Sequence, residues 1–343
     1  MSRVAVVLFN LGGPDGPAAV KPFLYNLFSD PAIIAAPAFA RKPIAAFIAA
    51  SRERSAMANY AHMGGGSPIL GETRRQAEAL ESSLRRRRPD DEIRVFVAMR
   101  YWKPRAAEIA GAVRWFAPDD VVLAPLYPQY STTTTASSMA EWHDHYDARC
   151  RDICCWFSNP GLIEAHAQRI EEAWTAAGRP KVRLLFSAHG LPRRIAESGD
   201  PYVWQVGETC AKVAERLPGD WDWSICYQSR VGPVKWLEPS TPQAILRAAA
   251  DGVGVLIDPI AFVSEHIETL VELDRDYAEL ARKAGIGVYL RAAAVGTAAP
   301  FIDGLADAVE RALARGAGGP DGRACPAAFG RCGRKEAACS TTS

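Results

Sequence analysis

The sequence predicts an open, doubly wound α/β protein, and three observations lead to that fold class. Short apolar, β-branched runs recur along the 343 residues, and a longer helix-like segment follows most of them. Runs that are apolar on both faces are typical of parallel strands covered by helices on both sides. Strand–helix alternation of this kind predicts a doubly wound sheet, and about eight strands divide naturally into two four-stranded halves.

The strands are expected in these runs: 4–9, 92–98, 120–126, 152–157, 182–187, 223–227, 253–258 and 286–291. Crossover helices are expected between them, for example at 73–87, 162–177, 206–216, 242–250, 264–283 and 301–315. We place the first half at 1–145 and the second at 146–315, because a polar Ser- and Thr-rich run after Tyr130 offers a break. Residues 316–343 form a tail, and its glycine-rich start is typical of a flexible linker.

Composition excludes several classes of protein. The 40 Lys and Arg residues balance 39 Asp and Glu residues, so the chain lacks the basic excess of a nucleic-acid binder. A hydrophobic content of 48% excludes a disordered chain. The sequence has neither a long apolar run for a spanning helix nor a signal-peptide cleavage pattern, so we expect a cytoplasmic protein whose eight cysteines are mostly thiols.

Polar and aromatic residues follow the predicted strands where ligands bind in open α/β sheets, beyond the carboxyl ends. Asn10 follows the first strand, Tyr127 the third and His189 the fifth. Because these ends face one edge of each half, we expect a cleft between the two halves.

His189 is the first candidate for chemistry, because it ends an apolar strand and Gly190 turns the chain sharply after it. Imidazole can accept a proton or hold a metal near neutral pH, and the sequence leaves both roles open. The alternative is a structural histidine that hydrogen-bonds a backbone carbonyl in a turn.

The second candidate is an acidic line in the predicted helix 264–283. Glu268, Glu272 and Asp276 recur at a spacing of four, beside His266. Like charges at this spacing destabilise a helix, so the presence of three acidic residues in a line calls for an explanation. One interpretation is a solvated acidic face. The other is a path for protons or for a divalent cation, where a His and carboxylate set favours iron(II), manganese or zinc.

Residues 32–50 are unusually apolar for a connection near the first ligand loop, and basic residues flank them. Burial in the core is the usual explanation. The alternative is an exposed apolar lip that admits a greasy substrate and touches a membrane surface.

Eight short segments stand out along residues 3–310. They are Asn10-Leu-Gly-Gly-Pro14, Gly64-Gly-Gly-Ser-Pro-Ile69, Leu126-Tyr-Pro-Gln-Tyr-Ser131, Ser187-Ala-His-Gly-Leu-Pro192, Gly199-Asp-Pro-Tyr202, Gln228-Ser-Arg-Val-Gly-Pro233, Trp236-Leu237 and Phe262-Val-Ser-Glu-His-Ile-Glu-Thr-Leu270. Together, and in this order, they resemble the ferrochelatase family. The resemblance implies two flavodoxin-like, chelatase-type halves with a porphyrin cleft between them. It implies insertion of Fe2+ into protoporphyrin IX, with coproporphyrin III as a variant substrate.

The resemblance also assigns residues. His189 matches the family's metal-site histidine and Glu268 its catalytic glutamate, while Glu272 and Asp276 continue the family's carboxylate path, often a π-helix. The segment 32–50 corresponds to the active-site lip. The candidate porphyrin contacts are Asn10, Tyr127, Ser131, Trp236, Phe262 and His266. For Tyr127, Trp236 and Phe262 the alternative is packing in the core.

Two other functions stay open at this point. A cobalt or nickel chelatase for another tetrapyrrole shares the architecture. A non-catalytic haem or porphyrin carrier has no use for repelling carboxylates, so the acidic line favours catalysis. We expect a monomer or homodimer, with possible peripheral contact to the inner face of the membrane.

The tail carries three cysteines, Cys325, Cys332 and Cys339, in a stretch with little to bury. Some ferrochelatases hold a 2Fe–2S cluster with such a tail and one cysteine of the body, and four thiolates are the usual ligand set. The usual body position aligns near Ala165, so we expect Cys154 or Cys155 as the fourth ligand, with Cys150 a third candidate. The alternatives are a disordered tail or a zinc site.

Overall fold

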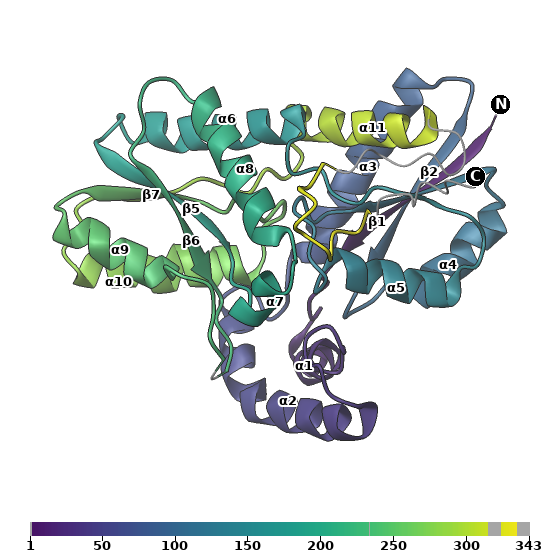
Figure 1. The fold of residues 1–343 in the computed structure, drawn as a ribbon, viewed down its shortest axis with the longest axis horizontal. Coiled ribbons are helices and arrows are strands. Elements are labelled where there is room, and N and C mark those ends of the chain that lie inside the picture. The colour runs from purple at the N-terminus through teal and green to yellow at the C-terminus, as the bar shows by residue number, and fades with distance from the viewer. Residues whose placement is uncertain (1, 233, 315–323, 335–343) are drawn as a thin grey trace, which may run out of the picture.

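The computed structural model describes residues 2–232, 234–314 and 324–334. It contains two four-stranded sheets, and every strand pairing in them is parallel. The strand order is β2-β1-β3-β4 in the first sheet and β6-β5-β7-β8 in the second, so the predicted fold class is confirmed (Figure 1). The strands are β1 (Arg3–Asn10), β2 (Glu92–Met99), β3 (Asp120–Pro125), β4 (Arg151–Asp152), β5 (Val182–His189), β6 (Trp223–Gln228), β7 (Gly254–Asp258) and β8 (Tyr289–Arg291).

Strand β4 is the main departure from the predicted strands, because it ends at Asp152 instead of 157. After Asp152 the chain leaves its pairing with β3, because Trp156 is held elsewhere. Its backbone N–H donates to Pro128 O at 3.0 Å and its indole N–H donates to Pro125 O at 2.8 Å. Cys154 and Cys155 therefore lie in a loop. Strand β4 also lies past residue 145, where we placed the boundary between the halves, and that boundary stays a prediction.

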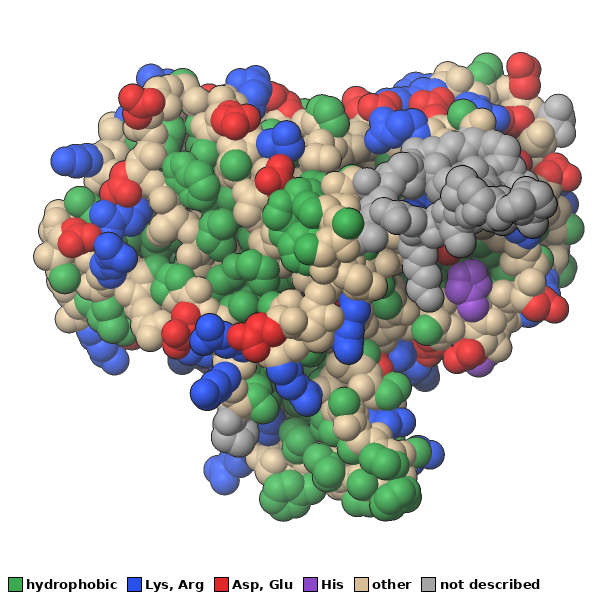
Figure 2. All heavy atoms as spheres, in the orientation of Figure 1, with side chains coloured by type: hydrophobic (Ala, Val, Ile, Leu, Met, Phe, Trp, Pro, Cys, Tyr) green, Lys and Arg blue, Asp and Glu red, His purple; other side chains and the backbone are tan. Residues whose placement is uncertain are grey.

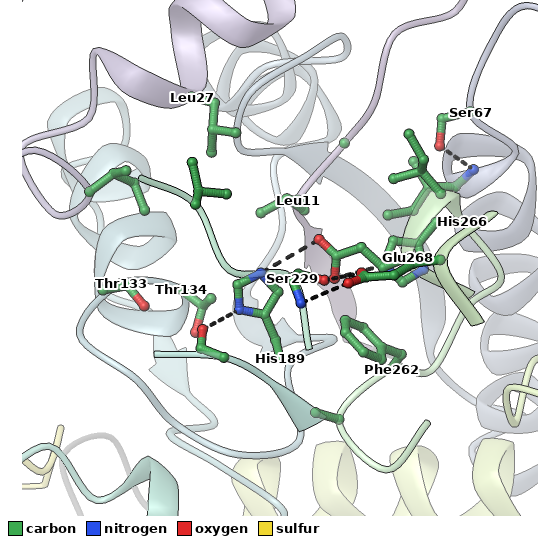
Figure 3. A pocket seen from close by; sticks show the side chains of 18 of the residues that line it. Leu11, Leu27, Ser67, Thr133, Thr134, His189, Ser229, Phe262, His266 and Glu268 are labelled. Atoms are coloured by element: carbon green, nitrogen blue, oxygen red, sulfur yellow. Dashed lines mark hydrogen bonds and ion pairs between the residues drawn. The ribbon is translucent and has the colours of Figure 1, made fainter. Parts of the chain in front are cut away.

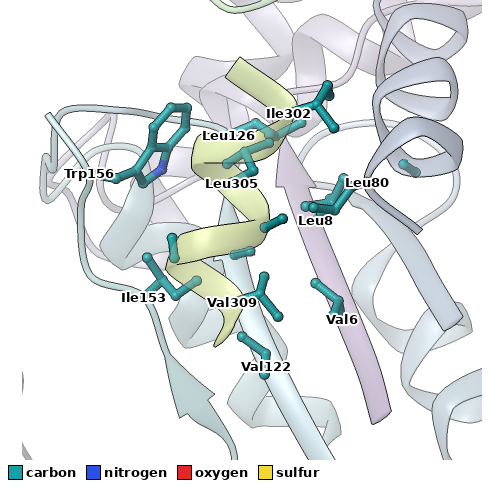
Figure 4. Close-up of a cluster of buried hydrophobic side chains, with 14 of the residues drawn as sticks. Val6, Leu8, Leu80, Val122, Leu126, Ile153, Trp156, Ile302, Leu305 and Val309 are labelled. Atoms are coloured by element: carbon teal, nitrogen blue, oxygen red, sulfur yellow. The ribbon is translucent and has the colours of Figure 1, made fainter. Parts of the chain in front are cut away.

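Helices cover both faces of the first sheet. One face buries a core against α3 (Ile69–Arg87) and α11 (Ala299–Ala314), and the other against α4 (Ala106–Phe116) and α5 (Thr135–His145). Figure 4 shows α11, from the far end of the chain, packed on strands of the first sheet. Helix α5 occupies the Ser- and Thr-rich run that we interpreted as a break.

The second sheet is covered in the same way. The helices on its faces are α6 (Pro160–Ala176) and α8 (Tyr202–Arg216) on one side, and α9 (Thr241–Ala250) and α10 (Ala278–Lys283) on the other. The expected helix at 264–283 is a π-helix over Glu268–Tyr277 that continues as α10. A short helix, α7 (Arg193–Glu197), follows β5.

Two helices near the N-terminus, α1 (Val20–Phe28) and α2 (Ala38–Ala61), project from the body at the bottom of Figure 1. They bury a small core of their own, which includes Phe23 and Phe28. The outer side of α2 stays apolar, because Phe39 is 83% exposed and Phe47 is 75% exposed. Figure 2 shows hydrophobic side chains gathered on this projection. The segment 32–50 is therefore partly exposed, although Ala45, Ala49 and most of Ile48 pack inward.

The described part of the tail, residues 324–334, packs against the body between the two halves. The backbone N–H of Arg331 donates to Gly199 O at 3.1 Å, and the Phe329 ring stacks on Trp204 at 5.9 Å. Cys325 and Cys332 are buried. This segment buries more than the glycine-rich composition suggested. Among the described residues, no helix combines the length and apolarity needed to cross a bilayer.

Candidate active site and thiol cluster

A cleft of about 550 Å³ lies between the two halves, at the carboxyl ends of both sheets. Its volume falls within the roughly 300–1,000 Å³ typical of small-molecule sites. Hydrophobic side chains from the first half, from the projecting helices and from the second half form most of its wall. They include Leu11, Phe23, Leu24, Leu27, Phe28, Ile33, Ile69, Leu191, Ile195, Val231, Trp236, Phe262 and Ile267.

His189 ends β5 and faces this cleft. Its Nδ1–H donates to the carbonyl oxygen of Gly190 at 2.5 Å, because a carbonyl can only accept. Its Nε2 then lies 3.5 Å from Glu268 Oε1 (Figure 3). The turn contact that we considered as an alternative is thus present, and it fixes the ring so that Nε2 points to the cleft.

His266 approaches the same carboxylate from the other side. Its Nδ1–H donates to Ser264 O at 3.0 Å, and its Nε2 lies 3.5 Å from Glu268 Oε2. The Phe262 ring packs on His266 at 4.8 Å and on His189 at 6.4 Å between ring centroids. Two imidazoles therefore flank one carboxylate, with an aromatic ring supporting both.

This arrangement couples the charges of the pair His189 and Glu268. Desolvation in the cleft alone lowers the pKa of His189, but the Glu268 carboxylate outweighs it and raises the pKa to about 9. Burial raises the pKa of Glu268, but His189 and then His266 outweigh it and hold that pKa below its usual range. At neutral pH the substrate-free residues therefore form an ion pair, in which both ring nitrogens of His189 are protonated and Glu268 is ionised.

The acidic line runs outward from Glu268. Glu272 accepts hydrogen bonds from Gln228 Nε2 at 3.1 Å, from the Ser229 backbone N–H at 2.9 Å, and from the hydroxyls of Ser229 and Tyr277. Asp276 follows at the exposed end, and all three acids line the cleft. These hydrogen bonds stabilise the Glu272 carboxylate and offset its repulsion by the neighbouring acidic residues.

Not all of the six predicted porphyrin contacts lie in the cleft. Five of the six line the cleft, namely Asn10, Tyr127, Trp236, Phe262 and His266. Ser131 lies behind the wall instead: it is buried, and its hydroxyl donates to Asp200 Oδ2 at 3.1 Å. Burial raises the pKa of Tyr127 far above its usual value, so its hydroxyl stays protonated.

Several polar residues of the cleft were not among the predicted contacts, although Arg230 belongs to one of the family-like segments. Arg52, Ser55 and Asn59 of α2 and Arg230 after β6 line the cleft at its polar parts. Tyr277 holds Glu272 from five positions along the π-helix. The i, i+5 spacing was the available signal, since π-helices pair residues at that distance.

Four cysteines converge where the tail meets the body. The Cys154 side chain hydrogen-bonds those of Cys155 and Cys332, and the Cys325 side chain does the same. Hydrogen bonds from Cys155 and Cys332 lower the pKa of Cys154 to about 4, and the one from Cys155 lowers that of Cys325 to about 6. The same contacts raise the pKa of the two donor thiols.

This ring of thiols contains both body cysteines that we proposed as alternatives, while Cys339 lies outside the described residues. The seven described cysteines are free of disulfides, as expected. Cys150 lies apart, with its thiol directed to Ala148 O. Within the described ranges, no group of three or more His, Cys, Asp or Glu side chains has the geometry of a metal centre as it stands.

The sequence model of one family, described as "Ferrochelatase", matches residues 3–313. The chain belongs to the ferrochelatase family. A ferrochelatase of Phenylobacterium zucineum is 59% identical over 334 residues, covering 96% of this chain and 97% of the relative. A ferrochelatase of Caulobacter vibrioides is 55% identical over 342 residues, covering 98% and 99%.

Two solved structures share the fold of this ferrochelatase family member. SirB from Bacillus subtilis superposes with a TM-score of 0.51 at 11% identity, over 92% of this chain and 96% of that one. CbiX, described as the terminal enzyme of sirohaem biosynthesis in denitrifying bacteria, gives a TM-score of 0.50 at 17% identity, over 91% and 99%. At these identities the likeness concerns the fold alone.

Proposed function

We propose that this ferrochelatase inserts Fe2+ into protoporphyrin IX to give protohaem, a lyase reaction that ends haem biosynthesis. The observation that carries the proposal is the group of His189, Glu268 and His266 at one wall of a largely apolar cleft. A flat apolar macrocycle suits the wall, and binding energy from such remote contacts can be used to distort it. In this position the centre of the macrocycle faces His189, Glu268 and His266.

Proton handling is the main task of these residues, because the porphyrin loses two pyrrole N–H protons as the metal enters. In the ion pair of His189 and Glu268, both ring nitrogens of His189 are already protonated at neutral pH, as the pKa values indicate. One of these protons must leave before the pair can take one from a pyrrole nitrogen. Glu272 and Asp276 supply an exit toward solvent, and the same carboxylates suit the incoming cation.

The activity is tested by anaerobic incubation with Fe2+ and protoporphyrin IX, following the loss of free-porphyrin fluorescence. We expect loss of fluorescence with the appearance of haem absorption. Parallel samples with coproporphyrin III test the variant substrate, and samples with Co2+ or Ni2+ test the hypothesis of a cobalt or nickel chelatase. Persistent fluorescence with tight porphyrin binding identifies a carrier instead.

We also propose that Cys154, Cys155, Cys325 and Cys332 hold a 2Fe–2S cluster. The donor set fits, because such clusters take four thiolates and these four sulfurs contact one another. Two of the four are already biased to the thiolate form by their neighbours, which is the form that binds metal. When bound, the cluster supplies one-electron chemistry and cross-links the tail to the loop after β4.

The cluster is tested by anaerobic purification and analysis of iron and acid-labile sulfide. We expect a red-brown protein with about two of each per chain, and Cys332→Ser should bleach it. A variant of Cys339 distinguishes ligand sets: we expect Cys339→Ser to keep the colour. A colourless, sulfide-free protein contradicts the cluster and leaves the chelatase function standing.

Finally, we propose that the protein works in the cytoplasm with α2 resting on the inner face of the membrane. Phe39, Ile44 and Phe47 are exposed on this helix, and the exposed Lys42 lies beside them. Exposed apolar and basic groups on one helix favour an anionic bilayer surface. The triple change of the three apolar residues to Ser should abolish liposome flotation without lowering the melting temperature. Unchanged flotation contradicts this contact.

A further inference from the structure

The side chain of Gln205 lies between the four cysteines of the thiol cluster and the backbone of Tyr130, and hydrogen bonds at both ends fix its orientation. Gln205 is fully buried on α8. Its Oε1 accepts the backbone N–H of Tyr130 at 2.7 Å. Because a backbone N–H can only donate, the oxygen end of the amide must face Tyr130. The NH2 end therefore faces the opposite way.

That NH2 end meets two of the sulfurs. Gln205 Nε2 lies 3.0 Å from Cys325 Sγ and 3.4 Å from Cys155 Sγ. The other two sulfurs receive backbone N–H groups of the tail, Cys154 from Gly333 and Cys332 from Arg334. Each of the four sulfurs thus has an N–H donor, and a single side chain supplies two of them.

The close packing of the tail explains how these donors are held. A Cβ atom on Gly333 would lie 2.6 Å from a ring carbon of Tyr130 and 3.0 Å from Cys154 Sγ. The backbone at Gly333 can therefore come this close to the sulfur because glycine has no side chain. Tyr130 in turn donates to Gln205, so the tail, Tyr130 and Gln205 form one packed unit around the sulfurs.

We infer that Gln205 tunes the reduction potential of the 2Fe–2S cluster, by donating hydrogen bonds to the sulfurs of Cys155 and Cys325. This inference rests on the cluster proposed above. N–H donors to cluster sulfurs withdraw electron density and stabilise the more negative, reduced state. Reduction adds one electron to the cluster and breaks no bond, with dithionite as the reductant in the test. The donors from Gln205 therefore raise the potential.

The test compares potentials of anaerobically purified full-length proteins by dithionite titration, with the electron paramagnetic resonance signal of the reduced cluster as readout. Gln205→Met keeps the volume and removes both donors, so its potential should shift to a more negative value. Gln205→Glu keeps the acceptor for Tyr130 but turns a carboxylate oxygen toward the sulfurs, so the shift should be larger. Gln168→Met removes an amide that donates to Glu164 on α6, and should titrate like the wild type.

A second measurement needs no variant. With 15N-labelled glutamine side chains, pulsed paramagnetic resonance of the reduced wild-type cluster should detect coupling to the Gln205 amide nitrogen. A Gln205→Met protein that titrates like the wild type, or a wild-type cluster without this nitrogen coupling, overturns the inference and leaves the cluster in place. A wild-type protein with no cluster overturns the cluster proposal itself, and the inference with it.

Discussion

The two halves of the molecule share one strand order, but their carboxyl edges carry different chemistry. The edge of the first sheet presents Asn10, Leu11 and Tyr127 to the cleft, all uncharged at neutral pH. The edge of the second presents His189, and the π-helix after β7 presents Glu268. We therefore propose that the first half only helps to hold a ligand, whereas the second half both lines the cleft and carries the reacting groups. Equal topology has not imposed equal function, because function depends on the site residues.

The largest effect should come from the reacting half. Glu268→Gln keeps the shape but removes the charge between the two imidazoles, so we expect kcat to fall by about 10²–10⁴-fold. Porphyrin affinity should stay within about twofold, since the apolar walls are intact. Glu279→Gln, which removes an exposed acid paired with Arg282, is the matched control and should leave kcat unchanged. Equal losses in both variants contradict the assignment.

A smaller and different effect should come from the binding half. Leu11→Ala removes apolar surface from the wall after β1 and should cost about 1–2 kcal/mol of porphyrin binding, or about tenfold in Kd. At saturating porphyrin, kcat should stay within about threefold, because no proton-handling group is changed. The two constants come from fluorescence titration and from single-turnover insertion. A loss confined to kcat would mean that this half also reacts.

The acidic line should show a gradient with distance from the pair. Glu272→Gln loses a carboxylate held by four donors and should raise KM for iron by about tenfold. Asp276→Asn, at the exposed end, should raise it by about two- to threefold, since solvent screens its charge. Initial rates at varied Fe2+ measure both. Equal losses at Glu268, Glu272 and Asp276 would contradict a graded path.

The charge coupling itself is visible by nuclear magnetic resonance titration of His189. Its pKa should be about 9 in the wild type and should fall in Glu268→Gln, because the raising carboxylate is gone. A pKa raised on folding stabilises the native state below the unfolded value and loses that contribution as the pH rises through about 9. The wild type should therefore lose some stability across this interval, and Glu268→Gln should lose less. An unshifted His189 pKa in the variant would show that the two groups are uncoupled.

The strands could be predicted well because buried parallel strands are apolar on both faces, a pattern that survives any tertiary context. Strand β4 could not, because its end depends on hydrogen bonds of Trp156 to the distant Pro125 and Pro128. Helix α5 was missed because Ser and Thr in its first turns are typical of breaks.

For the candidate site as well, features with a local sequence pattern could be predicted, whereas contacts between distant residues could not. His189 and Glu268 could be predicted from their places after strands and from the family resemblance. Ser131 could not be excluded, since its contact with Asp200 is 69 residues away in sequence. Tyr277 was missed because the acidic residues were followed at a spacing of four, whereas Tyr277 meets Glu272 at the spacing of five that a π-helix brings together. The sequence could not show that the loop after β4 brings both Cys154 and Cys155 next to the tail thiols, and the choice of cluster ligand stays a prediction.

The division into a binding half and a reacting half is tested most directly by His189→Ala in an anaerobic stopped-flow experiment with Fe2+ and protoporphyrin IX. The account predicts that the variant binds the porphyrin with near wild-type affinity and that the fluorescence of the bound ring then persists without insertion. Decay of that fluorescence at the wild-type rate, or failure of a folded variant to bind porphyrin, would contradict it.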